Sequence, residues 1–318
     1  MHAIGTTGSG KTKFFEHCIL QDILAGRGVC VVDPHGNHPD SLYRSLLSWL
    51  AKWQTRIKRP VHLIDPNARS HTVGFNPLAI PRGVDPSVIG ATALEAFERA
   101  WGDEDTNAKP TLQRVLFGVF VALAEAGLTL AEARLLFDRK DAAGIRAHVL
   151  ASVTNQDARD LLTRLDELSS SQTMFDAEVI APRNRISKLT RNPALRAIVG
   201  QTASTIDFSQ ALDDGHIVLV NLSGGDLAYE TDADLLGRLL VRFLFFHAKR
   251  RAHPERPFFL YLDECQRYHS GDVPQLLAEA RKYGLGAVLG HQYLRQLGEV
   301  QDEIRQAVLN TTNCKVIF

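Results

Sequence analysis

Residues 5–12 read GTTGSGKT, and this stretch limits the possible folds more than any other feature of the sequence. It matches the phosphate-binding loop pattern, in which a glycine is followed by four residues and then by Gly-Lys-Thr. The glycines let the backbone curl so that its N–H groups face an anion at the start of the next helix. The pattern predicts a strand, a loop and a helix within an α/β domain. It also predicts a nucleotide-binding site formed by Gly5, Thr6, Thr7, Gly8, Ser9, Gly10, Lys11 and Thr12.

Two side chains of this loop carry chemistry. We expect Lys11 to reach the β- and γ-phosphates of a nucleoside triphosphate and the Thr12 hydroxyl to hold Mg²⁺. The alternative is a glycine-rich turn that fits the pattern by chance. Strand-like residues at positions 1–4 and a helical pattern at 14–25 flank the loop on the correct sides, which favours the nucleotide site.

Strand and helix patterns alternate in residues 1–80. The apolar runs Gly28–Val32 and Val61–Ile64 each end in Asp-Pro, as expected of strands that are buried on both faces. Between them, Pro39–Trp53 carries leucines and aromatic residues at helical spacing. A strand, a helix and a strand at this distance predict parallel strands joined by a right-handed crossover.

Residues 81–204 differ, because apolar residues recur there every three or four positions and no strand pattern is found. The expected helices are Ala91–Trp101, Leu112–Ala126, Leu130–Asp138, Ala142–Leu150 and Ala158–Leu168. Strand patterns return at His216–Val220, Phe258–Leu262, Gly286–Leu289 and Cys314–Phe318, separated by the helical stretches Leu235–Ala248 and Pro274–Lys282. The sequence therefore predicts an α/β fold with a mostly parallel central sheet, interrupted by an all-helical insertion.

The predicted domain limits follow from this change of pattern. Residues 1–80 and 205–318 form the two halves of the α/β domain, and 81–204 form the insertion. Both chain ends are abrupt, which indicates a fragment whose second half is truncated. The most apolar stretch, 115–131, is short for a membrane span and contains Glu125, so no span is predicted.

Composition sets few further limits. Lys and Arg together number 36, as do Asp and Glu, so net charge does not point to nucleic acid. The four cysteines lie far apart without metal-ligand spacing, which favours free thiols. Runs of cations are usually solvated faces, but in an oligomer they would line a channel for the DNA backbone. Three such runs are Lys52, Arg56, Lys58 and Arg59; Arg183, Arg185, Lys188, Arg191 and Arg196; and Lys249, Arg250 and Arg251.

The second chemical signal is FFLYLDE at Phe258–Glu264. An apolar strand delivers Asp263 to its carboxyl end, where ligands bind in open α/β sheets. Asp263 suits the coordination of Mg²⁺, and Glu264 is placed to polarise the attacking water. A surface turn or a helix cap is the alternative, which a phosphate-binding loop in the same chain makes less favourable.

Two residues around the strand at 286–289 complete the candidate site. Gln292 follows this strand and is placed to sense the γ-phosphate, the alternative being an exposed polar residue. Arg281 precedes the strand. It either stabilises transition-state charge across a subunit boundary, as an arginine finger, or complements a helix dipole, and the sequence alone leaves both roles open.

These motifs, taken in order, resemble the type IV secretion coupling proteins of bacterial conjugation, within the HerA/FtsK class of DNA-pumping P-loop ATPases. The similar runs are GTTGSGKT, VVDPHGN, FNPL, LYLDECQRY and EARKYGLGAVLGHQY. The resemblance covers most of the chain and is most specific from Tyr261 to Leu297. It implies a RecA-like ATPase domain interrupted by a helical domain, with ATP and Mg²⁺ bound between subunits. It also implies that Arg281 is a trans-acting arginine finger and that Gln292 senses the γ-phosphate.

The resemblance further implies a homohexameric ring that pumps DNA without reading its sequence, by holding a single strand or the duplex backbone. Relaxosome and secretion-channel proteins are the implied partners. The implied location is the bacterial cytoplasm, at the inner face of the membrane through missing regions or partners. Alternatives are an ATPase of the same superfamily that moves protein in secretion or pilus assembly, a HerA-like DNA-processing translocase, and a nucleotide-dependent switch.

Overall fold

The computed structural model describes residues 1–68, 72–100, 110–224, 230–268, 273–299 and 302–318. Contacts between residues divide the chain into two compact units. The first comprises Met1–Val73 and Ile206–Phe318, and the second comprises Gly74–Thr205. These units are defined by contacts alone, so the predicted domain limits of 1–80, 81–204 and 205–318 stay a prediction.

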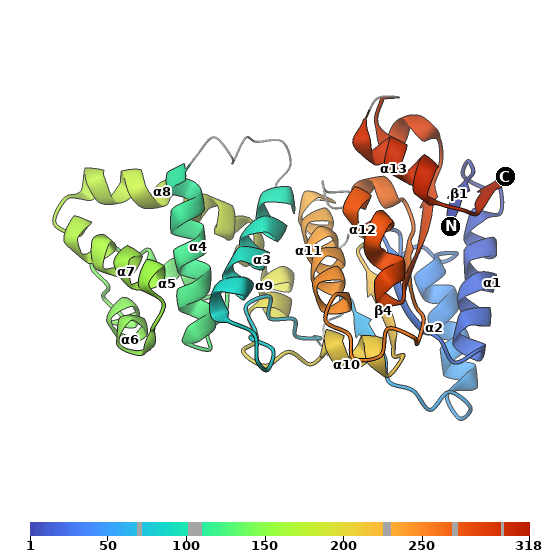
Figure 1. The fold of residues 1–318 in the computed structure, drawn as a ribbon, viewed down its shortest axis with the longest axis horizontal. Coiled ribbons are helices and arrows are strands. Elements are labelled where there is room, and N and C mark those ends of the chain that lie inside the picture. Colours follow the sequence, from blue (N-terminus) through green and yellow to red (C-terminus); the bar gives the residue numbers. More distant parts are fainter. Residues whose placement is uncertain (69–71, 101–109, 225–229, 269–272, 300–301) are drawn as a thin grey trace. The chain divides into compact units, whose positions relative to one another are not determined.

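The first unit is built on a parallel sheet of seven strands in the described residues, with the order β3-β4-β2-β5-β6-β1-β7. Figure 1 shows the two ends of the chain close together, in accord with the pairing of β1 with β7. All neighbouring strands run parallel. This confirms the α/β class and the parallel sheet. The strands are β1 (His2–Ile4), β2 (Gly28–Asp33), β3 (Val61–Ile64), β4 (Ile217–Asn221), β5 (Phe258–Leu262), β6 (Leu285–His291) and β7 (Lys315–Ile317).

Helices of the first unit cover both faces of this sheet. The α-helices are α1 (Lys11–Leu24), α2 (Leu42–Trp53), α10 (Phe208–Asp213), α11 (Glu230–Ala248), α12 (Val273–Glu279) and α13 (Glu303–Thr311). Three short 3₁₀ turns are η1 (Cys265–Arg267), η2 (Ala280–Tyr283) and η3 (Leu294–Leu297). One buried cluster joins α1 and α2 to the sheet through residues such as Phe15, Leu46, Val31, Leu219 and Tyr261. These two helices therefore form the layer on one face.

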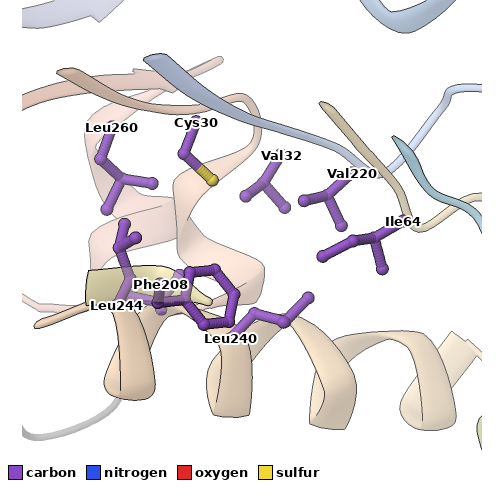
Figure 2. Close-up of a pocket in the computed structure, with 9 residues that line it drawn as sticks. Cys30, Val32, Ile64, Phe208, Val220, Leu240, Leu244 and Leu260 are labelled. Carbon is purple, nitrogen blue, oxygen red and sulfur yellow. The ribbon is translucent and has the colours of Figure 1, made fainter. Parts of the chain in front are cut away.

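The opposite face of the sheet packs against α10 and α11. Figure 2 shows Cys30, Val32, Val220 and Leu260 of the strands above Leu240 and Leu244 of α11, with Phe208 of α10 between them. Because side chains alternate along a strand, Val31 faces α1 and α2 while Cys30 and Val32 face α11. The gap that Figure 2 draws has no room for a water molecule, so it belongs to the core.

The second unit consists of helices joined by loops, with no strand in its described residues. Its helices are α3 (Pro86–Ala100), α4 (Pro110–Glu125), α5 (Ala133–Leu136), α6 (Ile145–Ser152), α7 (Gln156–Leu168), α8 (Gln172–Thr190) and α9 (Pro193–Val199). The buried α4 packs against α3, α7 and α8. The predicted end of α3 at Trp101 lies outside the described residues. Across the described residues, no helix combines the length and the apolar character needed to cross a bilayer.

Several helices of this unit differ from the sequence-based expectation, and the short α9 has no counterpart among the expected helices. The helix expected at Leu130–Asp138 forms only as the four-residue α5, and Arg146 donates to the carbonyl oxygens of Leu136 and Asp138 at and beyond its carboxyl end. The 19-residue α8 was not predicted. It buries Phe175, Val179, Pro182, Ile186 and Leu189, a spacing of three and four that its polar composition concealed.

Candidate active site

The phosphate-binding loop joins β1 to α1 and has the backbone that its glycines predict. Gly8 and Gly10 have φ values of 81° and 102°, which side chains disfavour. A Cβ on Gly5 would lie 2.4 Å from Ser9 Oγ, so the curl of the loop also requires glycine there. No side chain caps α1, and its first turn contains no acidic residue. The N–H groups at this helix start are therefore suited to an anion.

Lys11 meets the two carboxylates predicted to act with it. Its Nζ donates to Glu264 Oε1 at 3.0 Å and lies 3.7 Å from Asp263 Oδ1. All three residues are buried, with 6% of each exposed. The reason is topological: β5 and β1 both flank β6, so their carboxyl ends lie close together. The structure thus joins Lys11 in one ionic cluster with two carboxylates that follow it by 252 or more positions in the sequence.

Gln292 joins this cluster from the carboxyl end of β6. Its Nε2 donates to Glu264 Oε1 at 3.2 Å, the same oxygen that accepts from Lys11. Its backbone N–H donates to Gln296 Oε1 at 2.7 Å, which fixes the turn after the strand. The close approach of β6 depends on Gly290, where a Cβ would lie 2.9 Å from the Phe15 ring and 3.1 Å from Asp263 Oδ1.

Glu264 is held in an unusual backbone conformation. Its φ and ψ of 48° and 53° lie in the left-handed region, which costs a non-glycine residue about 1 kcal/mol or more. Its second carboxylate oxygen accepts from Gln266 Nε2 at 2.6 Å. Burial alone would raise the pKa of Glu264, but the hydrogen bonds from Gln266, Lys11 and Gln292 outweigh burial and lower it. Glu264 is therefore held as a charged acceptor.

Asp263 has the opposite electrostatic character. Burial raises its pKa to about 6; the charge of Lys11 opposes this rise, and the charges of Asp33 and Glu264 add to it. Asp33 itself accepts from the backbone N–H of His35 at 2.7 Å and of Tyr43 at 2.8 Å, so it organises the turn after β2. Two neighbouring carboxyl groups thus have pKa values shifted in opposite directions, which is typical of catalytic sites.

Arg281 is not brought to this cluster. It is exposed in η2, which precedes the amino end of β6, whereas Gln292 follows the carboxyl end. The seven residues of β6 span about 20 Å at the usual rise of a strand. Within one chain, Arg281 therefore lies at the opposite edge of the sheet from Lys11 and Glu264.

The three basic runs are partly structural. Arg59 donates to the carbonyl oxygens of Ile23, Arg27 and Gly215. Arg251 is buried and donates to Asp213 and to several carbonyl oxygens, and Arg185 is also buried. The first run has a half-buried arginine and the other two runs each have a buried one, so the sequence overstated the cationic surface.

Sequence reasoning missed two groups near the site. Gln266 supports Glu264, and its signal was present in the quoted run LYLDECQRY, where it follows Glu264 by two residues. His2 and His291 stack with ring centroids 4.6 Å apart, and their Nε2 atoms face each other between β1 and β6. Burial and the charge of His291 lower the pKa of His2 to about 4. No local pattern predicts this pair, because it depends on the order of the strands.

The residues present fit a magnesium nucleotide. Ser9 Oγ is buried without a hydrogen-bond partner in the described part of the chain, inside the loop that would surround a phosphate. The Thr12 hydroxyl and the Asp263 carboxylate are oxygen donors, the kind that Mg²⁺ prefers, and Mg²⁺ in such sites takes its other ligands from phosphates and water. The described residues contain no group of three or more His, Cys, Asp or Glu that could hold a metal.

Comparison with known proteins gives structural likenesses only. The chain matches no protein-family model and no curated protein. Among solved structures, it is similar to the bacterial conjugative coupling protein TrwBΔN70 in complex with sulphate, with 17% identity and a TM-score of 0.59 over 99% of this chain and 69% of that one. The plasmid coupling protein TrwB in complex with ADP and Mg²⁺ gives 16% identity and a TM-score of 0.59 over the same shares.

A second kind of protein matches equally well. VirB4 of Thermoanaerobacter pseudethanolicus gives 17% identity and a TM-score of 0.60, over 100% of this chain and 76% of that one. At these identities the likeness establishes the fold. The chain has the RecA-like P-loop fold of TrwB and VirB4, as its sequence predicted.

Proposed function

We propose that the chain is an ATP-hydrolysing motor that translocates DNA, of the type IV secretion coupling class. The observation that carries this proposal is the cluster of Lys11, Glu264 and Gln292, which three neighbouring strands deliver beside a phosphate-binding loop. A nucleotide-dependent switch needs only the loop. A hydrolase also needs a group that accepts a proton from water and a group that senses the γ-phosphate. Glu264, a charged carboxylate held by three hydrogen-bond donors, and the neighbouring amide of Gln292 meet these two needs.

Each residue has a role in this proposal. The N–H groups of residues 5–12 and the Lys11 ammonium would bind the phosphates of ATP, while Thr12 and Asp263 would hold Mg²⁺. When bound, Mg²⁺ neutralises charge on the phosphate oxygens. Glu264 accepts a proton from the attacking water, and Gln292 orients that water. Support comes from the similar structures of TrwB, which were obtained with ADP and Mg²⁺ and with the ATP analogue ADPNP.

The position of Arg281 supports an oligomer. This arginine is exposed at the far edge of the sheet from its own Glu264, so it would act on the nucleotide of a neighbouring subunit. We propose a homohexameric ring that surrounds DNA and contacts its backbone without reading its sequence. Relaxosome and secretion-channel proteins would be its partners, at the cytoplasmic face of the membrane.

The transported polymer is the least constrained part of the proposal. TrwB and VirB4 match the chain equally well, so the fold alone does not choose between motors of different function. The second candidate is therefore a secretion or pilus-assembly ATPase that acts on protein. A HerA-like DNA-processing translocase would share the DNA dependence but not the secretion partners.

The test is ATP hydrolysis by the purified chain with and without single-stranded and duplex DNA, with its oligomeric state measured in parallel. We expect DNA to stimulate hydrolysis several-fold in the assembled ring. Lys11→Ala serves as the control for contaminating ATPases, because it removes the phosphate-binding cation. Hydrolysis that is indifferent to every DNA while the ring is assembled would reject the DNA motor and leave the protein-directed alternative.

A further inference from the structure

A groove of about 740 Å³ runs along α2 in the first unit. Its lining includes Asn37 after β2, Asp65 after β3 and Asn221 at the end of β4. The candidate active site instead lies at the ends of β1, β5 and β6, and none of its residues lines the groove. The groove is therefore a second concave surface at the carboxyl edge of the same sheet, where open α/β sheets bind ligands.

The floor of the groove is a saturated hydrogen-bond network. Asn221 Nδ2 donates to Asn37 Oδ1 at 2.9 Å and to Asp65 Oδ2 at 3.1 Å, and Asn221 Oδ1 accepts from the N–H and Oγ of Ser223. Asp65 also accepts from Asn67 and from the Tyr43 hydroxyl. These polar groups are engaged with one another, so they stiffen the floor and are poorly suited to reading the edge of a base.

The wall of the groove presents cations that are not engaged. Leu42, Leu46 and Leu50 of α2 face the core at four-residue intervals. Arg44 and Lys52 are exposed and line the groove, eight residues or about 12 Å apart along the helix. Within the described ranges, neither side chain has an ion-pair or hydrogen-bond partner.

Acidic groups near these cations are already occupied. Glu16 of α1 lines the groove but pairs with Lys13 at 2.7 Å. Asp65 is bound by Asn67 and Asn221 as described. Glu16 is thus paired with a cation, and Asp65 keeps its charge at the floor, where neutral donors bind it. Arg44 and Lys52 on the wall remain available to bind phosphate.

An aromatic surface lies beside these cations. The Trp49 ring lines the groove and stacks on Trp53 with ring centroids 5.3 Å apart and an interplanar angle of 15°. The Arg56 guanidinium lies 4.7 Å from the centre of the Trp53 ring. Stacked rings interleaved with cations are the combination that proteins use to hold the bases and phosphates of single strands.

We propose that the α2 groove binds a single strand of nucleic acid, with a base against Trp49 and phosphates against Arg44 and Lys52. The saturated floor makes this binding indifferent to sequence, because recognition by stacking and charge does not depend on which base is present. The proposal rests on the proposed DNA motor and deepens it, by assigning the strand to a surface separate from the ATP site.

The first experiment measures binding of a fluorescein-labelled 20-nucleotide oligothymidylate to the full chain at several salt concentrations. Arg44→Glu/Lys52→Glu is expected to weaken binding at least about tenfold and to reduce the slope of log affinity against log salt by about 1.4. The matched control is Arg134→Glu/Lys140→Glu, which reverses two exposed cations that lie outside the three basic runs. Equal losses in both variants, or a loss in the control alone, would overturn the proposal.

The second experiment tests stacking with an abasic strand of the same length. Wild-type chain is expected to prefer the strand with bases by about fivefold or more, the usual effect of one stacked base. In Trp49→Leu, which keeps an apolar side chain against the core, this preference should disappear. An undiminished preference in Trp49→Leu would overturn the assignment of the base to Trp49.

The two proposals fail in different ways. If wild-type hydrolysis is stimulated by DNA but the groove variants bind and respond normally, the motor stands and the groove assignment is wrong. If no DNA binds the wild-type chain, the DNA motor fails and the groove assignment fails with it. Stronger competition by an acidic polypeptide such as polyglutamate than by the oligonucleotide would favour a protein ligand and overturn the nucleic-acid proposal.

Discussion

The carboxyl edge of the sheet contains two polar regions built on opposite principles. Around β1, β5 and β6, Asp263 and Glu264 are buried with shifted pKa values, Glu264 has a strained backbone and Ser9 Oγ has no partner in the described residues. Around β2, β3 and β4, Asn221 and Asp65 have their hydrogen bonds satisfied. Polar groups that are strained or unsatisfied are kept where chemistry is done, and saturated groups are kept where only shape is needed.

The largest expected effect is a loss of ATP turnover when the region around β1, β5 and β6 is changed. Glu264→Gln removes the proton acceptor but keeps the size of the side chain, so ATP turnover should fall at least about 100-fold. ATP binding should persist, because Lys11 and the loop are unchanged. The free energy of unfolding should fall by only about 1–2 kcal/mol, since the amide oxygen still accepts from Lys11 and Gln292, and the bond that the second carboxylate oxygen accepts from Gln266 is lost. Unchanged turnover would show that another group accepts the proton.

The second prediction concerns the hydrogen-bonded region around β2, β3 and β4, where a substitution should lower stability and not turnover. Asn221→Leu removes four hydrogen bonds of a side chain that is 1% exposed, among them those of the Asn37 amide oxygen and the Ser223 N–H. Urea unfolding should show a loss of about 2–4 kcal/mol, while turnover per folded molecule stays near wild type. The exposed Ser48→Ala in the same groove is the control and should lie within about 0.5 kcal/mol of wild type.

The sequence predicted each strand from its local pattern, because buried parallel strands are short apolar runs. Val61–Ile64 and Phe258–Leu262 match β3 and β5 at both ends. It also selected Lys11, Asp263, Glu264 and Gln292, since each follows or precedes such a run at a recognisable motif. The structure brings these four together, and their catalytic roles stay a prediction.

What the sequence did not predict depends on the order of the strands. The sheet order β3-β4-β2-β5-β6-β1-β7 is set by crossovers, so the meetings of His2 with His291 and of Asn221 with Asp65 have no local signal. The three basic runs overstated the cationic surface for a similar reason. The Arg59 guanidinium donates to the carbonyl oxygens of Ile23 and Gly215, which lie far from it in the sequence.

A smaller effect should come from the support of Glu264. Gln266→Met keeps the length of the side chain but removes the hydrogen bond to Glu264 Oε2, so kcat should fall about tenfold, or about 1.4 kcal/mol, with KM unchanged. The matched control is Gln113→Met in the second unit, where Gln113 Nε2 donates to Glu98 Oε1 at 2.9 Å. If both variants lose turnover equally, or if KM alone rises, Gln266 does not position the acceptor.

The smallest expected effect compares two histidine pairs, one on each side of the sheet. His2 and His291 join β1 to β6, and His62 Nε2 lies 3.0 Å from His216 Nδ1 beside β3 and β4. Burial lowers the pKa of all four, that of His2 to about 4, so folding disfavours their charged forms. The unfolded chain takes up protons below about pH 6.5, and stability is therefore lost as pH falls from 6.5 towards 4.

His2 should contribute most of this acid sensitivity. It is fully buried, the amino terminus and Lys315 further disfavour its charge, and Glu264 favours charge only on its partner His291. Between pH 7 and pH 5, His2→Phe should reduce the loss of unfolding free energy by about 2 kcal/mol, and His62→Phe by less because that ring is partly exposed. Asp263, whose pKa is raised, acts in the opposite direction in every variant and cancels in the comparison. Urea midpoints at the two pH values measure the difference, and an equal or larger change in His62→Phe would contradict the ranking.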